Sequence, residues 1–109
     1  MKAWDIYTYD FPEAGSHPAV IVSHPDRAAR AAWVNVLLCS SQKSNRSPQE
    51  HEVMLNGADG LDWETLCRCD LLWLVERTKL HHCRGSVSRE RRKQIVEKIN
   101  AVMGWKQIY

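Results

Sequence analysis

An arginine and an aspartate stand two positions apart in the sequence Cys67-Arg68-Cys69-Asp70. Successive side chains of a β-strand point to opposite faces, so this spacing places Arg68 and Asp70 on one face and both cysteines, with Leu71, on the other. A guanidinium beside a carboxylate suits phosphoryl chemistry, because the planar arginine fork matches phosphate oxygens and stays charged at any relevant pH. Taken alone, the pair is more typical of a structural surface ion pair, which contributes about 0–1 kcal/mol.

Four cysteines raise the question of a disulfide or a metal site. A reducing cytosol disfavours disulfides, and the spacing of Cys67 and Cys69 differs from the C-x-x-C of a redox motif or a zinc knuckle. Zinc is conceivable because two histidines directly precede the last cysteine, in His81-His82-Cys83. Buried free cysteines more often behave as small apolar residues on strands. We therefore expect neither a metal nor another cofactor.

The elements that must position these residues are mostly strands. Runs of β-prone and apolar residues bounded by turn residues predict strands over residues 3–9, 19–23, 33–39, 52–55 and 64–74, with the last extended or bent over 75–80. Residues 25–32 are predicted to form one or two helical turns, and residues 84–86 a turn. Ser88 is expected to cap a helix that runs to about Met103 and stops at Gly104. The apolar face of this helix, which must pack on the strands, consists of Ile95, Ile99, Val102 and Met103.

Composition limits the class of protein. The chain has 109 residues, of which 44% are hydrophobic and 26% charged, and this is typical of one globular domain over residues 1–109. No apolar run approaches the ~18 residues of a membrane-spanning helix, and the N-terminus lacks the pattern of a secretory signal, so we expect a cytoplasmic protein without membrane contact. The net charge of +2 does not by itself indicate nucleic-acid binding, and the basic run over residues 84–93 is most simply the solvated face of a helix. Strands followed by one amphipathic helix predict a mainly β fold, a small barrel with a C-terminal helix.

Three segments, in their order along the chain, resemble the MazF/PemK (Kid) family of type II toxin–antitoxin systems. They are Trp4-Asp5-Ile6-Tyr7 followed by His17-Pro18-Ala19-Val20-Ile21-Val22-Ser23, then Leu38-Cys39-Ser40-Ser41-Gln42, and then Arg68-Cys69-Asp70. The last of these matches the R-C-D of the PemK branch, and the C-terminal Gly85-Ser86-Val87-Ser88 plus helix also fits the family. His17 stands where the family usually has an arginine, and the loop over residues 11–16 is several residues shorter than usual.

The resemblance implies a small SH3-like barrel of the MazF/PemK/CcdB toxin type. Its implied activity is that of a sequence-selective, metal-independent endoribonuclease that cleaves single-stranded RNA, namely mRNA. The implied partners are a second copy, forming a homodimer, and a cognate antitoxin that neutralises the toxin, commonly through a disordered acidic tail. Cleavage without a metal needs a base for the 2′-hydroxyl, an acid for the leaving 5′-oxygen and a cation for the charge on phosphorus. The implied products are a 2′,3′-cyclic phosphate and a 5′-hydroxyl.

Within this chemistry, we expect Asp70 to accept the proton and Arg68 to stabilise the charge on phosphorus. His17 is expected to take over part of the work of the missing arginine, because an ordinary imidazole pKa of about 6.5 suits either proton transfer, although a turn histidine bonded to the backbone is an equal alternative. Ser40 could hold a phosphate oxygen, while a hydroxyl bonded to its own strand end is the simpler interpretation. The residues expected to contact the RNA strand are Ser41, Lys43, Arg46 and Trp73, the tryptophan by stacking unless it lies in the interior or at a dimer interface.

Two other functions are compatible with the sequence. A non-enzymatic toxin resembling the CcdB gyrase poisons would act through an aromatic C-terminal end, and this chain closes with Trp105-Lys106-Gln107-Ile108-Tyr109. An inactive member of the same fold would bind only RNA or protein, in keeping with the replacement of the usual arginine by His17. The Arg68-Cys69-Asp70 motif favours the ribonuclease over the gyrase poison, whereas the inactive member stays open until RNA cleavage is assayed.

Overall fold

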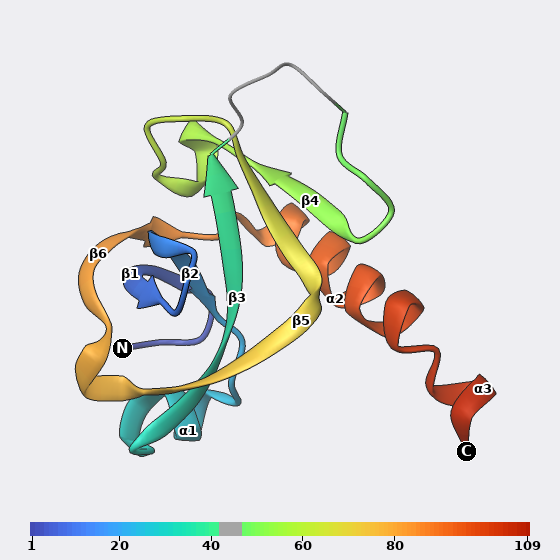
Figure 1. The fold of residues 1–109 in the computed structure, drawn as a ribbon, viewed down its shortest axis with the longest axis horizontal. Helices are drawn as coiled ribbons and strands as arrows, with labels where there is room; N and C mark the ends of the chain where they lie inside the picture. The colour runs from blue at the N-terminus through green and yellow to red at the C-terminus, as the bar shows by residue number, and fades with distance from the viewer. Residues whose placement is uncertain (42–46) are drawn as a thin grey trace.

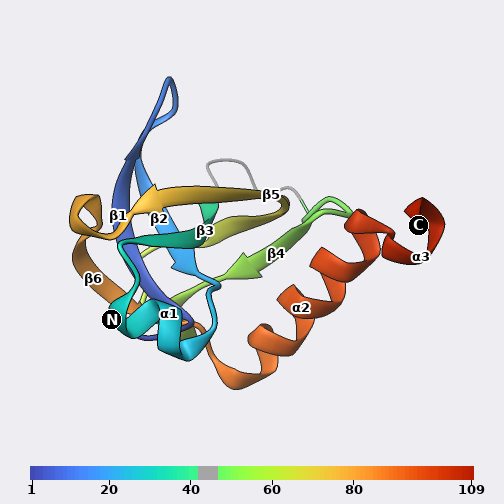
Figure 2. The same cartoon turned by 90° about the horizontal axis from the view of Figure 1, so that it is seen from below.

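Six antiparallel strands form one sheet in the computed structural model, which describes residues 1–41 and 47–109, with only the backbone of Ser41. The strands are β1 (Asp5–Phe11), β2 (Gly15–Ile21), β3 (Trp33–Ser41), β4 (Glu52–Leu55), β5 (Thr65–Glu76) and β6 (His81–Ser86), in the spatial order β4-β5-β3-β2-β1-β6. The helices are α1 (Pro25–Arg30), α2 (Arg89–Met103) and α3 (Trp105–Ile108), with 3₁₀ turns η1 (Gly57–Asp59) and η2 (Arg77–Lys79). The sheet curls into a half-barrel, α2 runs alongside β4, and α3 carries the C-terminus away from the barrel (Figure 1 and Figure 2). The expected mainly β fold with a C-terminal helix is confirmed.

Most predicted elements form close to their expected positions, including all five strands, the helical turns near residues 25–32 and the long C-terminal helix. The turn predicted for residues 84–86 is wrong, because these residues belong to β6, which pairs with β1. Gly85 packs against the backbone beside Gly60, where a Cβ on Gly85 would come within 2.3 Å of the Asp59 carbonyl oxygen. The glycine therefore permits a close backbone approach between β6 and the η1 segment, and does not form a turn.

Gly85→Ala is expected to destabilise the fold by about 1–3 kcal/mol, the usual cost of inserting a methyl group where well-packed surroundings must move. Its new Cβ would meet backbone atoms, so no flexible side chain can move aside. Urea unfolding followed by circular dichroism measures the free energy of unfolding. Gly57→Ala is the control, because a Cβ at that position meets nothing within 4 Å. Equal stability of the two variants would show that this backbone contact is not tight.

Alternation along the strands divides the core into two clusters on opposite faces of the sheet. The first cluster includes Cys39 and Cys67, which face each other on β3 and β5, together with Ile95 of α2. The second includes Phe11 and Val36, with partly buried aromatic side chains packed against it. Helix α2 therefore covers the face that carries the cysteines, and it does so through Ile95 and Ile99, two of the four residues predicted for its apolar side.

Strand β5 bends in its middle. Leu37 of β3 faces Leu72, whereas Cys39 faces Cys67, so β5 has more residues than β3 between these two rungs of the ladder. Such a bulge redirects the strand and interrupts the strict alternation of its side chains. Leu71, which we expected to point inward with the cysteines, is 45% exposed for this reason.

The carboxylate of Asp59 ties η1 to the start of α2. Its Oδ1 accepts a hydrogen bond from the Ser88 N–H at 2.8 Å, and its Oδ2 accepts from the Asn56 N–H at 2.9 Å and from Arg91 Nη1 at 2.5 Å. Ser88 is the N-cap residue, as predicted, but its side chain makes no capping bond. Burial favours a raised pKa for Asp59, yet the bonds from Ser88, Asn56 and Arg91 outweigh it and hold the pKa below its ordinary value.

Candidate active site

Arg68 and Asp70 form a bidentate ion pair on β5. The Arg68 Nε donates to Asp70 Oδ1 at 3.0 Å, and the Arg68 Nη2 donates to Asp70 Oδ2 at 2.7 Å. Their side chains are 41% and 31% exposed, so a ligand in solution can reach both. Because a guanidinium has five N–H donors, this pairing uses only part of its capacity to bind an anion.

The two groups shift each other's pKa. The hydrogen bond from Arg68 lowers the pKa of the Asp70 carboxyl, and the same bond raises the pKa of Arg68. The negative charge of Glu52, which faces Arg68 across the β4–β5 ladder, adds to the raised pKa of Arg68. Both members of the pair are therefore charged at neutral pH, and Asp70 is a weak base while the pair is closed.

Ser40 and Arg68 lie on the face of the sheet away from α2. Cys39 and Cys67 point into the core that α2 covers, so the neighbouring positions Ser40 and Arg68 point to the other face. Ser40 lies directly opposite Leu66, two residues before Arg68 along β5. The charged pair is therefore not sealed beneath the C-terminal helix.

His17 lies on the same face, near the end of the β1–β2 hairpin. The β2–β3 ladder ends with Ala19 opposite Leu38, so His17 and Ser40 each lie two residues beyond that last pair. The Nε2 of His17 is 2.9 Å from the carbonyl oxygen of Ala14, to which it can donate a hydrogen bond. This contact is the backbone bond expected of a turn histidine, and a catalytic role for His17 stays a prediction.

Trp73 follows the pair along β5, opposite Val36 of the second core cluster. Its ring packs edge-on against Phe11 with the ring centroids 5.3 Å apart. The indole nitrogen is buried and has no hydrogen-bond partner in the described part of the chain. The ring thus contributes to the core, and base stacking on it stays a prediction. Of the other expected RNA contacts, Lys43, Arg46 and the side chain of Ser41 lie outside the described residues.

Sequence reasoning missed two neighbours of these residues. Glu52, which faces Arg68, is only 5% exposed, and its Oε1 accepts a hydrogen bond from the Gln49 N–H at 2.8 Å. Tyr9 faces His17 across the β1–β2 hairpin. The short turn of this hairpin fixes its register, so the position of Tyr9 opposite His17 could have been predicted from the sequence. The pairing of Glu52 with Arg68 could not, because it joins strands that no short turn connects.

The four candidate catalytic residues are partly buried and lie outside the main hollows of the described surface. None of Arg68, Asp70, His17 and Ser40 lines any of the four hollows delineated on the described residues. The pair is accessible to a substrate because both of its side chains are partly exposed.

The cysteines are all free, and three of them lie in the core. A hydrogen bond to Cys39, together with burial, raises the pKa of Cys67, so its sulfur stays a protonated thiol. Cys83 is exposed on β6. Within residues 1–41 and 47–109, no group of three or more histidine, cysteine, aspartate or glutamate side chains is arranged to hold a metal ion.

Two exposed apolar regions stand out on the surface. Trp33, Leu72 and Leu74 lie on the paired strands β3 and β5, and Leu74 is 56% exposed. The second region is the C-terminal tail, where Ile108 is 70% and Tyr109 93% exposed. No helix in the described part of the chain is long and apolar enough to cross a membrane.

Comparison with known proteins links this geometry to one family. The family model described as PemK-like, MazF-like toxin of type II toxin–antitoxin system matches residues 2–103. An endoribonuclease in complex with its cognate antitoxin from a mycobacterial species has a similar fold, with a TM-score of 0.81 at 19% identity over 95% of each chain. The Mycobacterium tuberculosis toxin MazF-mt6 gives a TM-score of 0.79 at 15% identity over 92% of this chain and 96% of that one. A MazE–MazF structure from Deinococcus radiodurans gives 0.75 at 16% identity over 95% and 96%, respectively. No curated protein matches the sequence.

Proposed function

Because the chain belongs to the family of PemK-like, MazF-like toxins of type II toxin–antitoxin systems, we propose that it is an endoribonuclease that cleaves single-stranded mRNA without a metal ion. The observation that carries this proposal is the Arg68–Asp70 pair, which is partly exposed on the sheet face away from α2. A guanidinium and a carboxylate supply the cation and the proton acceptor that such cleavage needs.

The closed pair also suggests how the base is activated. A phosphate of the RNA binds Arg68 and competes with Asp70 for the guanidinium, which raises the pKa of Asp70. Asp70 then takes the proton of the 2′-hydroxyl, whose oxygen attacks phosphorus while the bond to the 5′-oxygen breaks and that oxygen takes up a proton. His17 is the candidate donor of this proton, and Ser40 the candidate hydrogen-bond donor to a phosphate oxygen. The products are a 2′,3′-cyclic phosphate and a 5′-hydroxyl.

The substrate is single-stranded because the 2′-hydroxyl must rotate into line with the bond that breaks, which a duplex resists. Lys43, Arg46 and Ser41 follow β3 in the sequence and are the proposed contacts to the strand, with Trp73 as a candidate stacking surface. These contacts would set the sequence preference.

The decisive test is incubation of the purified protein with a mixed-sequence RNA in the presence of EDTA. We expect cleavage, with a 2′,3′-cyclic phosphate and a 5′-hydroxyl at the new ends. An otherwise identical oligonucleotide with one 2′-deoxy nucleotide at the cut site should resist cleavage there. Absence of cleavage, or cleavage that appears only when Mg²⁺ is added, would refute the proposal and favour an inactive binding protein.

We further propose that the chain forms a homodimer through the apolar region of β3 and β5. Trp33, Leu72 and Leu74 are large side chains exposed on the paired strands β3 and β5, and such a patch commonly marks a protein interface. Burial of this patch in a second copy would remove it from water.

Leu74→Glu is expected to convert the dimer into a monomer, because an unpaired carboxylate is costly to bury in an apolar interface. Light scattering coupled to size-exclusion chromatography measures the mass in solution. Ile108→Lys is the matched control, since Ile108 is an exposed apolar residue of the C-terminal tail. A wild-type chain that is monomeric at micromolar concentration would contradict the proposal.

A cognate antitoxin is the second proposed partner, and the cytoplasm, where mRNA is translated, the proposed place of action. Similar structures include an endoribonuclease with its cognate antitoxin and a MazE–MazF pair. The gyrase-poison alternative has less support, because its aromatic tail, residues 105–109, lies beyond the residues that match the family.

A further inference from the structure

The carboxylate of Glu52 belongs to β4 and lies beside the Arg68–Asp70 pair. Glu52 is the first residue of this strand and is directly opposite Arg68 in the β4–β5 ladder. The neighbouring pair of the ladder, Val53 and Cys67, points into the core that α2 covers. Because opposite residues share a face of the sheet and successive pairs alternate between the faces, Glu52 and Arg68 share the face of the candidate site. Their Cβ atoms are therefore about 4.5–5.5 Å apart, close enough for the two side chains to interact.

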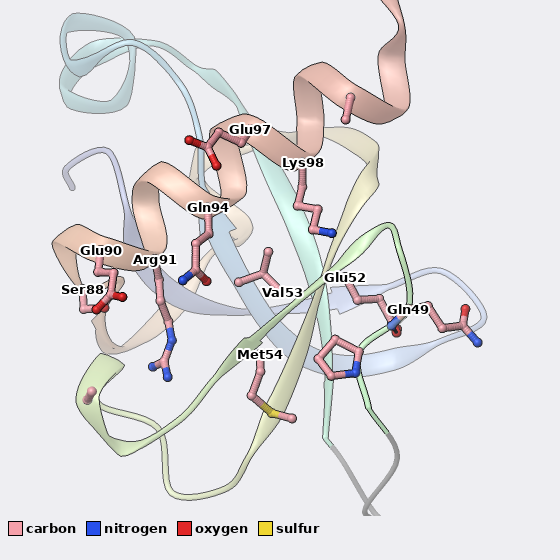
Figure 3. Close-up of a pocket in the computed structure, with 13 residues that line it drawn as sticks. Gln49, Glu52, Val53, Met54, Ser88, Glu90, Arg91, Gln94, Glu97 and Lys98 are labelled. Carbon is pink, nitrogen blue, oxygen red and sulfur yellow. Dashed lines mark hydrogen bonds between the residues drawn. The ribbon is translucent and has the colours of Figure 1, made fainter.

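Glu52 is held in place by the turn that precedes β4. Its Oε1 accepts a hydrogen bond from the Gln49 N–H at 2.8 Å, and the Glu52 N–H donates to the Gln49 carbonyl at 3.0 Å. Figure 3 shows the two side chains next to each other at the start of the strand. The residue is only 5% exposed, so water and salt screen its charge little. Glu52 therefore presents a fixed negative charge to the strand that carries Arg68.

Arg68 keeps a donor group that its pair with Asp70 does not use. The Nε and Nη2 groups donate to Asp70, whereas Nη1 donates to no atom of the described residues. The hydrogen bond to Asp70 is the largest cause of the raised pKa of Arg68, and the negative charge of Glu52 adds to it. Glu52 thus attracts the guanidinium independently of Asp70.

We propose that Glu52 is a positioning residue, which keeps the Arg68 guanidinium in the site while an RNA phosphate displaces Asp70 from it. This role rests on the proposed ribonuclease function, in which Asp70 must release Arg68 before it takes the proton of the 2′-hydroxyl. Without a second carboxylate, the released side chain would be free to turn toward solvent, and the cation would leave the phosphorus whose charge it stabilises. The same negative charge repels the phosphate, so Glu52 weakens RNA binding while it favours the chemical step.

The mobility of the Arg68 side chain tests this role without RNA cleavage. Nitrogen relaxation of the Nε–H group, assigned by the loss of its NMR signal in Arg68→Lys, gives an order parameter that reports picosecond-to-nanosecond motion. Asp70→Ala removes both acceptors of the pair, and we expect Glu52 to keep Arg68 restrained in this variant. Adding Glu52→Gln, which keeps the shape but removes the charge, should lower the order parameter below about 0.6, the range of flexible groups. Glu50→Gln in the same background is the matched control, because Glu50 is an exposed glutamate of the same turn, and it should leave Arg68 restrained.

RNA cleavage separates this role from a merely structural one. Glu52→Gln should lower kcat about ten- to a hundredfold, because a small displacement of the guanidinium removes much of its effect on the transition state. It should also lower KM about threefold, because a negative charge that repels the phosphate is lost. A variant that is only less stable contains less active protein and does not bind RNA more tightly. Glu50→Gln should leave both constants unchanged.

An Arg68 side chain that is mobile in Asp70→Ala, or that stays restrained when Glu52→Gln is added, overturns the inference. A kcat of Glu52→Gln equal to that of the wild type, or a KM that does not fall, also overturns it. Circular dichroism checks the fold of Glu52→Gln, and if this variant unfolds, Asp70→Ala alone decides. A wild-type chain that cleaves no RNA refutes the proposed function, whereas the relaxation measurements still decide the role of Glu52.

Discussion

Arg68→Ala is expected to lower the rate of RNA cleavage by about 10²–10³-fold, the usual loss when one group that stabilises developing charge is removed. The guanidinium binds Asp70 through two hydrogen bonds of 3.0 and 2.7 Å. Arg68→Lys keeps the charge but lacks the planar fork, so it should recover only part of the activity. Single-turnover cleavage of a fluorescent RNA oligonucleotide measures the rate of the chemical step.

Asp70→Asn should also lower this rate, by about 10²–10⁴-fold, because the amide cannot accept the proton of the 2′-hydroxyl. The pH profile distinguishes this role from a structural one. The bond from Arg68 lowers the pKa of Asp70 in the free protein, so wild-type activity should fall as acid protonates Asp70. RNA that occupies Arg68 should raise the apparent pKa seen in the rate of the bound complex above that seen in kcat/KM.

The chain offers a matched control for both substitutions. Arg30 and Asp26 form another arginine–aspartate pair, with Nη2 and Oδ1 3.6 Å apart on α1 and with side chains 79% and 75% exposed. Arg30→Ala and Asp26→Asn should leave cleavage unchanged. If Arg68→Ala and Asp70→Asn also cleave at the wild-type rate, the pair is only a surface ion pair and the catalytic proposal is refuted.

Local periodicity explains which parts of the site could be predicted from sequence. The alternation of a strand places Arg68 and Asp70 on one face whatever the strand pairs with, and the structure has them there. The same alternation predicts the wrong side for Leu71, because the register shift between β3 and β5 moves the following side chains of β5 to the other face of the sheet. The position of Glu52 opposite Arg68 likewise depends on a partner strand and not on neighbours in sequence.

Glycine has two different structural roles in the C-terminal part of the chain. Gly104 has a φ of 56° and ends α2, which is the use that a glycine after an apolar helix predicts. Gly85 instead lies within β6 against the backbone of Asp59, which precedes it by 26 residues in the sequence. A sequence pattern can predict that Gly104 ends a helix, because the helix residues directly precede it. It cannot predict the role of Gly85, because the backbone that approaches this glycine is distant in the sequence.

Asp59→Asn is expected to destabilise the fold by about 3–5 kcal/mol, because removal of one partner of a buried ion pair leaves the other charge without compensation. The Asp59 side chain is fully buried, and Arg91 Nη1 lies 2.5 Å from its Oδ2. The same carboxylate accepts the backbone N–H groups of Ser88 and Asn56, so its loss weakens the start of α2 as well as η1. Urea unfolding gives the free energy, with Asp62→Asn as the control because Asp62 is an exposed aspartate in the same loop.

The acid dependence of stability tests the same contact independently. The folded protein holds the pKa of Asp59 below its value in the unfolded chain, so the contribution of this carboxylate is fully present above the ordinary carboxyl pKa. It is lost as the pH falls through the lowered pKa of the folded state. The difference in unfolding free energy between the wild type and Asp59→Asn should therefore shrink as the pH is lowered below about 4. A contribution of the Asp59 charge must vanish when the carboxylate is protonated. If the difference in unfolding free energy between the wild type and Asp59→Asn stays constant down to pH values near 2, the contribution of Asp59 comes from its packing and neutral hydrogen bonds and not from its charge.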